Sequence, residues 1–252
     1  MHCCPNRTEF IMKKLFLSGL LAVVACPLLA ADPSPKIEVK NAAAALGSQT
    51  NYAWTSTVEV GANARFRPGP TEGRTERGGY TALLMSFGDN TNRAVLKGTN
   101  GAIQTPDNGW QSLAEAANDS GDGGFNPTMF LVRMIQAFKT PDLQAAGFAN
   151  DAKELKADDD AISGDLTEDA AKAQLSFRPR GGNGDGPTVS NAKGSVKFWI
   201  KDGLLVKYQF HLQGTVSFNG NDREVDRTTT VEINNVNTTR IDVPDEAKKK
   251  LP

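Results

Sequence analysis

Cysteine is confined to the start of this 252-residue chain, at Cys3, Cys4 and Cys26. The sequence after residue 26 therefore offers no disulfide, no thiolate nucleophile and no cysteine ligand for a metal. Histidine is equally scarce: the chain has two, and beyond the first residues only His211 remains. Because a zinc site needs several histidine or cysteine ligands, neither a metal nor another cofactor is expected.

A strong excess of one charge is also missing, since 28 Lys and Arg stand against 29 Asp and Glu. This balance argues against a nucleic-acid partner, which normally requires a basic face. The chain has no G-x-S-x-G elbow, and its glycine-rich stretches match neither G-x-G-x-x-G nor the P-loop. These absences predict a protein that is not an enzyme. A hydrolase built around His211 is the enzymatic alternative, because catalytic triads assemble in space and not in sequence.

The residues before Asp32 have the order of a secretory signal peptide. Lys13 and Lys14 follow Met12 as a short positive region, and residues 15–25 form a nearly unbroken apolar run. Small residues then precede the polar mature sequence, as a signal peptidase requires. The apolar run is too short to span a bilayer comfortably, so no integral membrane span is expected.

This pattern predicts a signal peptide over residues 12–31 and cleavage after Ala30 or Ala31. Residues 1–11 are interpreted as a misassigned start, and residues 32–252 as a single mature domain. The predicted location is therefore the periplasm or the exterior of the cell. A lipoprotein anchored at Cys26 is the minor alternative, because the residues before it loosely resemble a lipobox.

The mature chain shows strand patterns, then central helices, then a long antiparallel meander. Alternation predicts strands over residues 51–60, 80–87, 93–97, 102–105, 161–166, 196–200, 204–212, 223–235 and 240–243. Helices are predicted over residues 37–46, 126–139, 141–155, 167–173 and 244–251. Residues 65–79, 119–124 and 180–187, rich in glycine and polar side chains, are predicted to be loops or irregular edges. The sum is an α+β fold with a large antiparallel sheet.

The turn at Lys201-Asp202-Gly203 decides how the last two long strands align. A two-residue turn would pair Ile200 with Leu205 and place the apolar rows of the two strands on opposite faces. A three-residue loop with a left-handed Gly203 would pair Ile200 with Leu204 and align the rows. Because register follows the buried face, the prediction is the three-residue loop with a bulge.

Several stretches together resemble the LolA-like superfamily of periplasmic lipoprotein carriers and its lipid-binding lipoprotein relatives. The matching stretches are residues 51–57 (NYAWTST), 130–138, 194–204 (GSVKFWIKDGL) with the strands that follow, and 239–244 (TRIDVP). The resemblance implies a half-barrel, in which a single curved antiparallel sheet has helices covering its concave face and holds acyl chains there. By position, Arg65 and Arg67 are the candidates for the ligand-gating arginine of that family.

The leading hypothesis is an exported, non-enzymatic domain that binds or carries a lipid or another apolar ligand. The apolar stripe of the helix at 126–139 would then line a cavity under the sheet, although plain core packing is the usual origin of such a stripe. The predicted ligand-binding residues form an inward row: Trp54, Phe130, Met134, Phe138, Phe198, Tyr208 and Phe210. The alternative is an envelope interaction module with a packed core and no ligand cavity, whose protein partner the sequence does not name.

Overall fold

The computed structural model describes residues 33–61, 64, 67–88, 90–105, 107–118, 126–176, 187–218 and 220–251. The chain from Pro33 onward forms one compact unit. The predicted signal peptide, the predicted loop at 119–124 and all but the last residue of the predicted loop at 180–187 lie outside the described residues, as does Arg65.

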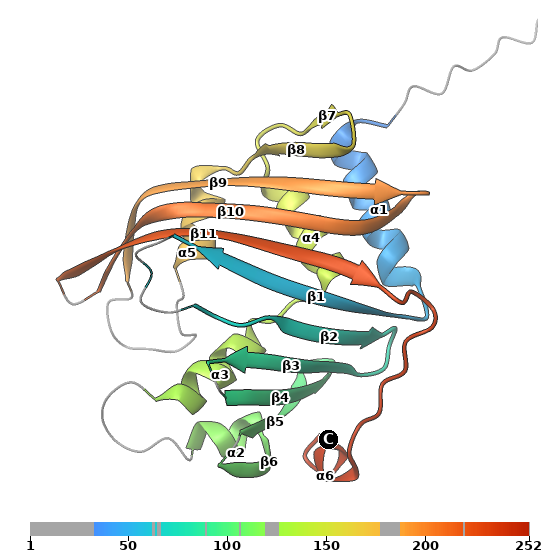
Figure 1. Ribbon diagram of the computed structural model, residues 1–252, viewed down its shortest axis with the longest axis vertical. Helices are drawn as coiled ribbons and strands as arrows, with labels where there is room; N and C mark the ends of the chain where they lie inside the picture. The colour runs from blue at the N-terminus through green and yellow to red at the C-terminus, as the bar shows by residue number, and fades with distance from the viewer. Residues whose placement is uncertain are drawn as a thin grey trace, which may run out of the picture. The chain divides into compact units, whose positions relative to one another are not determined.

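Eleven strands form one antiparallel sheet (Figure 1). In chain order they are β1 (Asn51–Val60), β2 (Thr71–Glu76), β3 (Thr81–Phe87), β4 (Asn90–Lys97), β5 (Asn100–Thr105), β6 (Asn108–Ser112), β7 (Lys156–Asp158), β8 (Ala161–Asp165), β9 (Thr188–Lys201), β10 (Leu204–Phe218) and β11 (Asn221–Asn234). Their order across the sheet is β6-β5-β4-β3-β2-β1-β11-β10-β9-β8-β7.

The sheet consists of two meanders that meet in its middle. The chain enters at β1, runs outward to β6, crosses through helices to β7 at the opposite edge, and returns strand by strand to β11. There β11 pairs with β1, from Ala53 opposite Asn234 to Val60 opposite Arg227. Because β6 and β7 do not pair with each other, the sheet stays open. The predicted α+β fold with one open antiparallel sheet is thereby confirmed.

Six helices lie in the described part of the chain: α1 (Pro35–Ser48), α2 (Leu113–Asn118), α3 (Pro127–Gln136), α4 (Pro141–Asp151), α5 (Glu168–Leu175) and α6 (Asp245–Lys248). The helix start predicted at Asn126 is confirmed for α3, because the Asn126 side chain accepts a hydrogen bond from the Met129 amide at 2.9 Å. That bond satisfies one of the amides left open at a helix start. Among the described residues, none of these helices has the length and apolarity needed to cross a membrane.

Five of the six helices cover one face of the sheet. Helices α1, α4 and α5 lie over the half that contains β8 to β11, and α2 and α3 lie over the half that contains β3 to β6 (Figure 1). Side chains from both halves form one continuous core, in which Phe148 of α4 contacts Phe210 of β10 with ring centroids 4.6 Å apart. Burial of these large side chains is the main stabilising contribution to the fold.

A smaller cluster covers the outer face of the sheet at β4 to β6. Side chains alternate between faces along a strand, so Ala94 joins the main core whereas its neighbour Val95 joins this second cluster. The C-terminal segment supplies Val243 and Ala247 to the cluster, and Trp110 completes it. Helix α6 is therefore held against the face that the other helices leave open.

One carboxylate ties this C-terminal segment to α2. Ser112 and Glu115 form a capping box at the start of α2, because the Ser112 amide donates to Glu115 and the Glu115 amide donates to Ser112 Oγ. The Lys250 ammonium donates to the same carboxylate at 2.8 Å. This ammonium first, and the Ser112 amide second, lower the pKa of Glu115 from 4.5 to about 2.

We expect acid to remove this link in a defined pH window. A lowered folded-state pKa stabilises the fold above the unfolded value of 4.5, and that contribution is lost as the pH falls toward 2. The thermal midpoints of the wild type and Glu115→Gln should therefore differ above pH 4.5 and converge near pH 2. An offset that stays constant with pH would contradict this assignment.

The prediction that residues 65–79 lack a regular strand is wrong for Thr71–Glu76, which forms β2 between β1 and β3. Its side chains are mostly polar, and Gly73 interrupts any apolar alternation, so the strand signal is weak. The structure explains the glycine: a Cβ at Gly73 would overlap the indole of Trp54 on β1. Gly73 is therefore a position where one strand must leave room for a large neighbour.

The predicted three-residue loop between β9 and β10 is also wrong. Asp202 and Gly203, with φ of 52° and 73°, form a two-residue turn that pairs Ile200 with Leu205. Both residues are left-handed, as the favoured two-residue hairpin turns require. A bulge between Leu205 and Lys207 then shifts the register by one. The expected bulge exists, but it lies inside the strand and not in the loop.

This bulge aligns the apolar rows that the turn alone would separate. Beyond it, Tyr208 pairs with Phe198 and Phe210 pairs with Val196, and all four side chains are buried. Before it, Leu205 is fully buried. The register therefore still follows the buried face, as predicted, but a bulge inside the strand produces it and not the loop.

The predicted last strand at 240–243 is not a strand. Its backbone pairs with no neighbouring strand, although the Arg240 carbonyl accepts a hydrogen bond from the Arg74 guanidinium. Ile241 and Val243 instead pack into the outer cluster. The apolar alternation there reflects packing onto the sheet and not pairing within it. The predicted helices at 141–155 and 244–251 exist but end earlier, at Asp151 and Lys248.

Candidate functional site

A cavity of about 290 Å³ lies between the helix-covered face of the sheet and the segment that joins α3 to α4. Its floor comes from β1, β2, β3, β10 and β11, and its roof from α3, the following link and the start of α4. The lining residues are Trp54, Ser56, Thr71, Leu83, Met85, Met134, Ile135, Ala137, Phe138, Lys139, Pro141, Gln144, Tyr208, Phe210, Thr229 and Val231.

The cavity is mostly apolar, and two of the aromatic side chains that line it stack on each other. The rings of Trp54 and Phe138 are stacked, with centroids 5.8 Å apart and planes inclined by 16°. Such stacked pairs stabilise a contact beyond the area they bury. Met85 and Met134 add flexible, polarisable side chains, which adapt to a ligand better than branched ones.

Apolar side chains outnumber polar ones in the lining, and the Tyr208 hydroxyl and the Trp54 indole are both hydrogen-bonded. The Tyr208 hydroxyl donates to Gln144 Oε1 at 2.6 Å, and Trp54 Nε1 donates to Thr75 Oγ1 at 3.3 Å. Burial, followed by the charge of neighbouring Tyr52 and Asp142, raises the pKa of Tyr208 well above its ordinary value. The phenol is therefore a neutral donor and not a base. The lining is suited to binding an apolar chain and not to proton transfer.

The link between α3 and α4 forms the rim of the cavity. Ala137 and Lys139 line it and are exposed, while Phe138 between them is half-buried against Trp54. A single cationic side chain therefore stands at the rim above an apolar interior.

Five of the seven residues in the predicted inward row line this cavity: Trp54, Met134, Phe138, Tyr208 and Phe210. The other two lie elsewhere. Phe198 is fully buried in the core, and Phe130 is 38% exposed on α3. Ligand binding by this row stays a prediction, which the structure narrows to the five lining residues.

The sequence reasoning missed several lining residues. Leu83 and Met85 alternate on β3, so their shared face was recognisable, but nothing in that strand marks it as adjacent to Trp54. Thr229 and Val231 likewise share one face of β11, but nothing in that strand marks them as neighbours of Trp54. Gln144 carries no local signal at all, because its role depends on a hydrogen bond to a residue 64 positions away.

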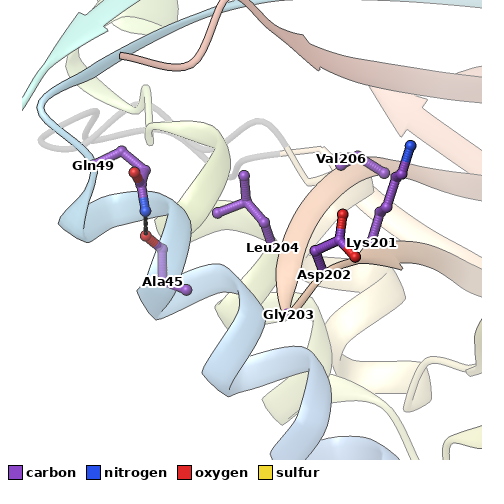
Figure 2. A pocket seen from close by; sticks show the side chains of 7 residues that line it. All are labelled: Ala45, Gln49, Lys201, Asp202, Gly203, Leu204 and Val206. Atoms are coloured by element: carbon purple, nitrogen blue, oxygen red, sulfur yellow. Dashed lines mark hydrogen bonds between the residues drawn. The ribbon is translucent and has the colours of Figure 1, made fainter.

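A second hollow, of about 440 Å³, lies between the end of α1 and the β9–β10 turn. Figure 2 shows Ala45 of α1 and Gln49, which follows the helix, on one side and Lys201 to Leu204 on the other. Lys201, Asp202 and Gly203 are all exposed, so this hollow is a surface depression with little apolar enclosure. Although it is larger, it is the weaker candidate for an apolar ligand.

The outer face of the sheet places His211 between two potential triad partners. Its Nε2 lies 2.8 Å from Asp226 Oδ1, and Ser195 is its register partner on β9. Within the described residues, no hydrogen bond joins Ser195 to His211. The open surface of a sheet also offers no set of oxyanion donors, which acyl transfer requires. His211 and Gln213 both donate to Asp226 and lower its pKa, as in a surface polar cluster.

Two solved structures are similar to this chain. The lipoprotein LppX of Mycobacterium tuberculosis is 11% identical, with a TM-score of 0.42, over 85% of this chain and 100% of LppX. LprF of Mycobacterium bovis is 9% identical, with a TM-score of 0.41, over 84% of this chain and 97% of LprF. No protein-family model and no curated protein matches the chain. Likenesses at this level of identity concern the fold alone.

Proposed function

We propose that the protein is exported and that its mature domain binds a single-chain apolar ligand without chemical conversion. The observation that carries the proposal is the cavity that Trp54 and Phe138 help to line, which is mostly apolar, partly open and lined by adaptable side chains. Ligand sites usually have these properties. The ligand would lie along the sheet, beneath the link from α3 to α4.

The size of the cavity limits the ligand. At about 290 Å³ it lies at the lower end of the range of about 300–1,000 Å³ that is usual for ligand sites. It therefore suits one alkyl chain and not a lipid with several chains. A larger cargo would require α3 to move away from the sheet.

The alternative, an interaction module with a packed core, accounts for part of the structure. Most of the space between helices and sheet is filled, as fully buried Phe198 and Leu205 illustrate. The cavity is the feature that this alternative does not explain. Ile37, Phe130 and Leu143, the large apolar side chains most exposed in the described residues, belong to three different helices.

Ligand position is testable through Trp54, the tryptophan that lines the cavity. Trp110 belongs to the outer cluster, and Trp199 lies between the Lys197 and Lys207 ammonium groups. In the variant Trp110→Phe/Trp199→Phe, dodecanoate brominated at its chain end should quench the remaining indole fluorescence, whereas unbrominated dodecanoate should not. Binding without bromine-dependent quenching would place the ligand outside the cavity.

Export makes a separate prediction about the mature N-terminus. The intact mass of the protein recovered from the periplasm or medium should correspond to a chain that begins at Ala31 or Asp32. A mass that corresponds to a lipid on Cys26 as the first residue would establish the lipoprotein alternative. Retention of the whole leader in the cytoplasm would contradict export.

A further inference from the structure

Arg227 projects from β11 onto the helix-covered face of the sheet. It pairs with fully buried Leu212 on β10 and with Val60 on β1, and paired residues of antiparallel strands share a face. Its Nη2 donates to the carbonyl of Gln174 in the last turn of α5 at 3.2 Å. Its Nε atom is buried, and among the described residues it has no hydrogen-bond partner.

The charge of this side chain is incompletely compensated. Burial lowers the pKa of Arg227 below its ordinary value, yet a guanidinium remains protonated at neutral pH. Within the described part of the chain, no carboxylate lies at ion-pair distance from it, and its one partner is a neutral carbonyl. A partly buried cation without a charged partner destabilises the folded protein unless an anion binds beside it.

Arg227 is also a neighbour of the cavity. Thr229, which lines the cavity, lies two residues along the same strand and on the same face. Two residues of a strand span about 7 Å, so an amphiphile with its chain in the cavity can place its head group beside Arg227. The guanidinium fork is suited to bind a carboxylate or a phosphate in bidentate fashion.

We infer that the ligand is an anionic single-chain amphiphile whose head group binds Arg227 while its chain occupies the cavity. This inference rests on the proposed function and adds the chemical class of the ligand. Lys139 at the rim offers a second cation, but it is exposed and its charge is already hydrated. The partly buried guanidinium is therefore the head-group site.

Calorimetric titration of the mature protein at pH 8 with dodecanoate, dodecyl phosphate and uncharged dodecanol tests this assignment. The wild type should bind at least one of the two anions about 10- to 100-fold more tightly than dodecanol, the size expected for a hydrogen bond to a charged group. Arg227→Met should remove this preference and leave the affinity for dodecanol unchanged. Lys207→Met, on the outer face of the sheet, is the matched control and should retain the preference, whereas Lys139→Met tests the rim. The relative affinities of the two anions distinguish a fatty acid from a phosphate ester.

Equal affinity of the wild type for dodecanol and both anions would overturn the inference while leaving the proposed function supported. Loss of the preference in Lys139→Met but not in Arg227→Met would overturn it in favour of the rim. Failure of all three compounds to bind would contradict the proposed function itself. Even if Arg227→Met does not fold, the wild-type comparison and Lys139→Met together decide the question, because a preference that survives in Lys139→Met excludes the rim. If it folds, its thermal midpoint should be no lower than that of the wild type, because the substitution removes an uncompensated charge.

Discussion

Replacing Gly73 with alanine should lower the free energy of unfolding by about 3 kcal/mol, at the upper end of the usual cost of overpacking a core. The added methyl group would overlap the Trp54 indole, which is only 4% exposed and is held by its hydrogen bond to Thr75. The indole would have to leave its position beside Phe138, so the variant should also bind the ligand more weakly. Urea denaturation followed by circular dichroism measures the first effect.

Gly109→Ala is the matched control for this prediction. Gly109 also lies in a strand, β6, but a Cβ there would meet no atom within 4 Å. Alanine at that position should leave the stability unchanged or raise it slightly, because glycine is the more flexible residue in the unfolded chain. Equal stability losses in the two variants would show that Gly73 has no special role in accommodating Trp54.

Replacing Phe138 with aspartate should weaken ligand binding by about 10- to 100-fold, the equivalent of losing one buried aromatic contact. Phe138 is the side chain that closes the cavity against Trp54, and a carboxylate there would face an apolar interior. Isothermal titration with dodecanol is the appropriate measurement, because an uncharged ligand separates this effect from repulsion between carboxylates.

Phe130→Asp provides the comparison, since Phe130 lies on α3 but does not line the cavity. Its affinity for dodecanol should stay within about threefold of the wild type, a difference below 1 kcal/mol. Lys207→Ala, on the outer face of the sheet, should likewise have no effect. If Phe130→Asp abolished binding and Phe138→Asp did not, the ligand would lie outside the cavity described here.

The strands were predictable where one of their faces is buried. Alternation identified β1 and β10 because their inward side chains are mostly apolar and their outward ones mostly polar. The same rule failed for β2, whose few buried positions include Gly73 and Thr75. A strand that accommodates its neighbour's side chain with a glycine carries no apolar pattern of its own.

The hairpin between β9 and β10 shows a second limit. The sequence predicted correctly that Phe198 and Tyr208 share the buried face, but not how the chain achieves it. A two-residue turn followed by a bulge aligns the long strands in the same way as a three-residue loop does. The choice depends on Leu205, which fills the core ahead of the bulge.

The site was partly predictable for a related reason. The inward-facing side chains of a strand or helix can be recognised from the pattern of that element alone. This identified the lining residues Trp54, Met134, Phe138, Tyr208 and Phe210. Whether such a row is packed tightly or leaves a cavity depends on contacts between distant elements. Phe198 belongs to the same row by pattern, yet the surrounding core buries it completely.

The central claim is that this domain takes up one apolar chain, and native mass spectrometry of the mature protein tests it most directly. The protein should be purified without detergent from an exporting host, and dodecanoate should then be added in increasing amounts. The account predicts a single added mass of one ligand for each chain, greatly reduced in Phe138→Asp. An unchanged mass throughout the titration, with no lipid carried through purification, would contradict the account and leave a packed interaction module.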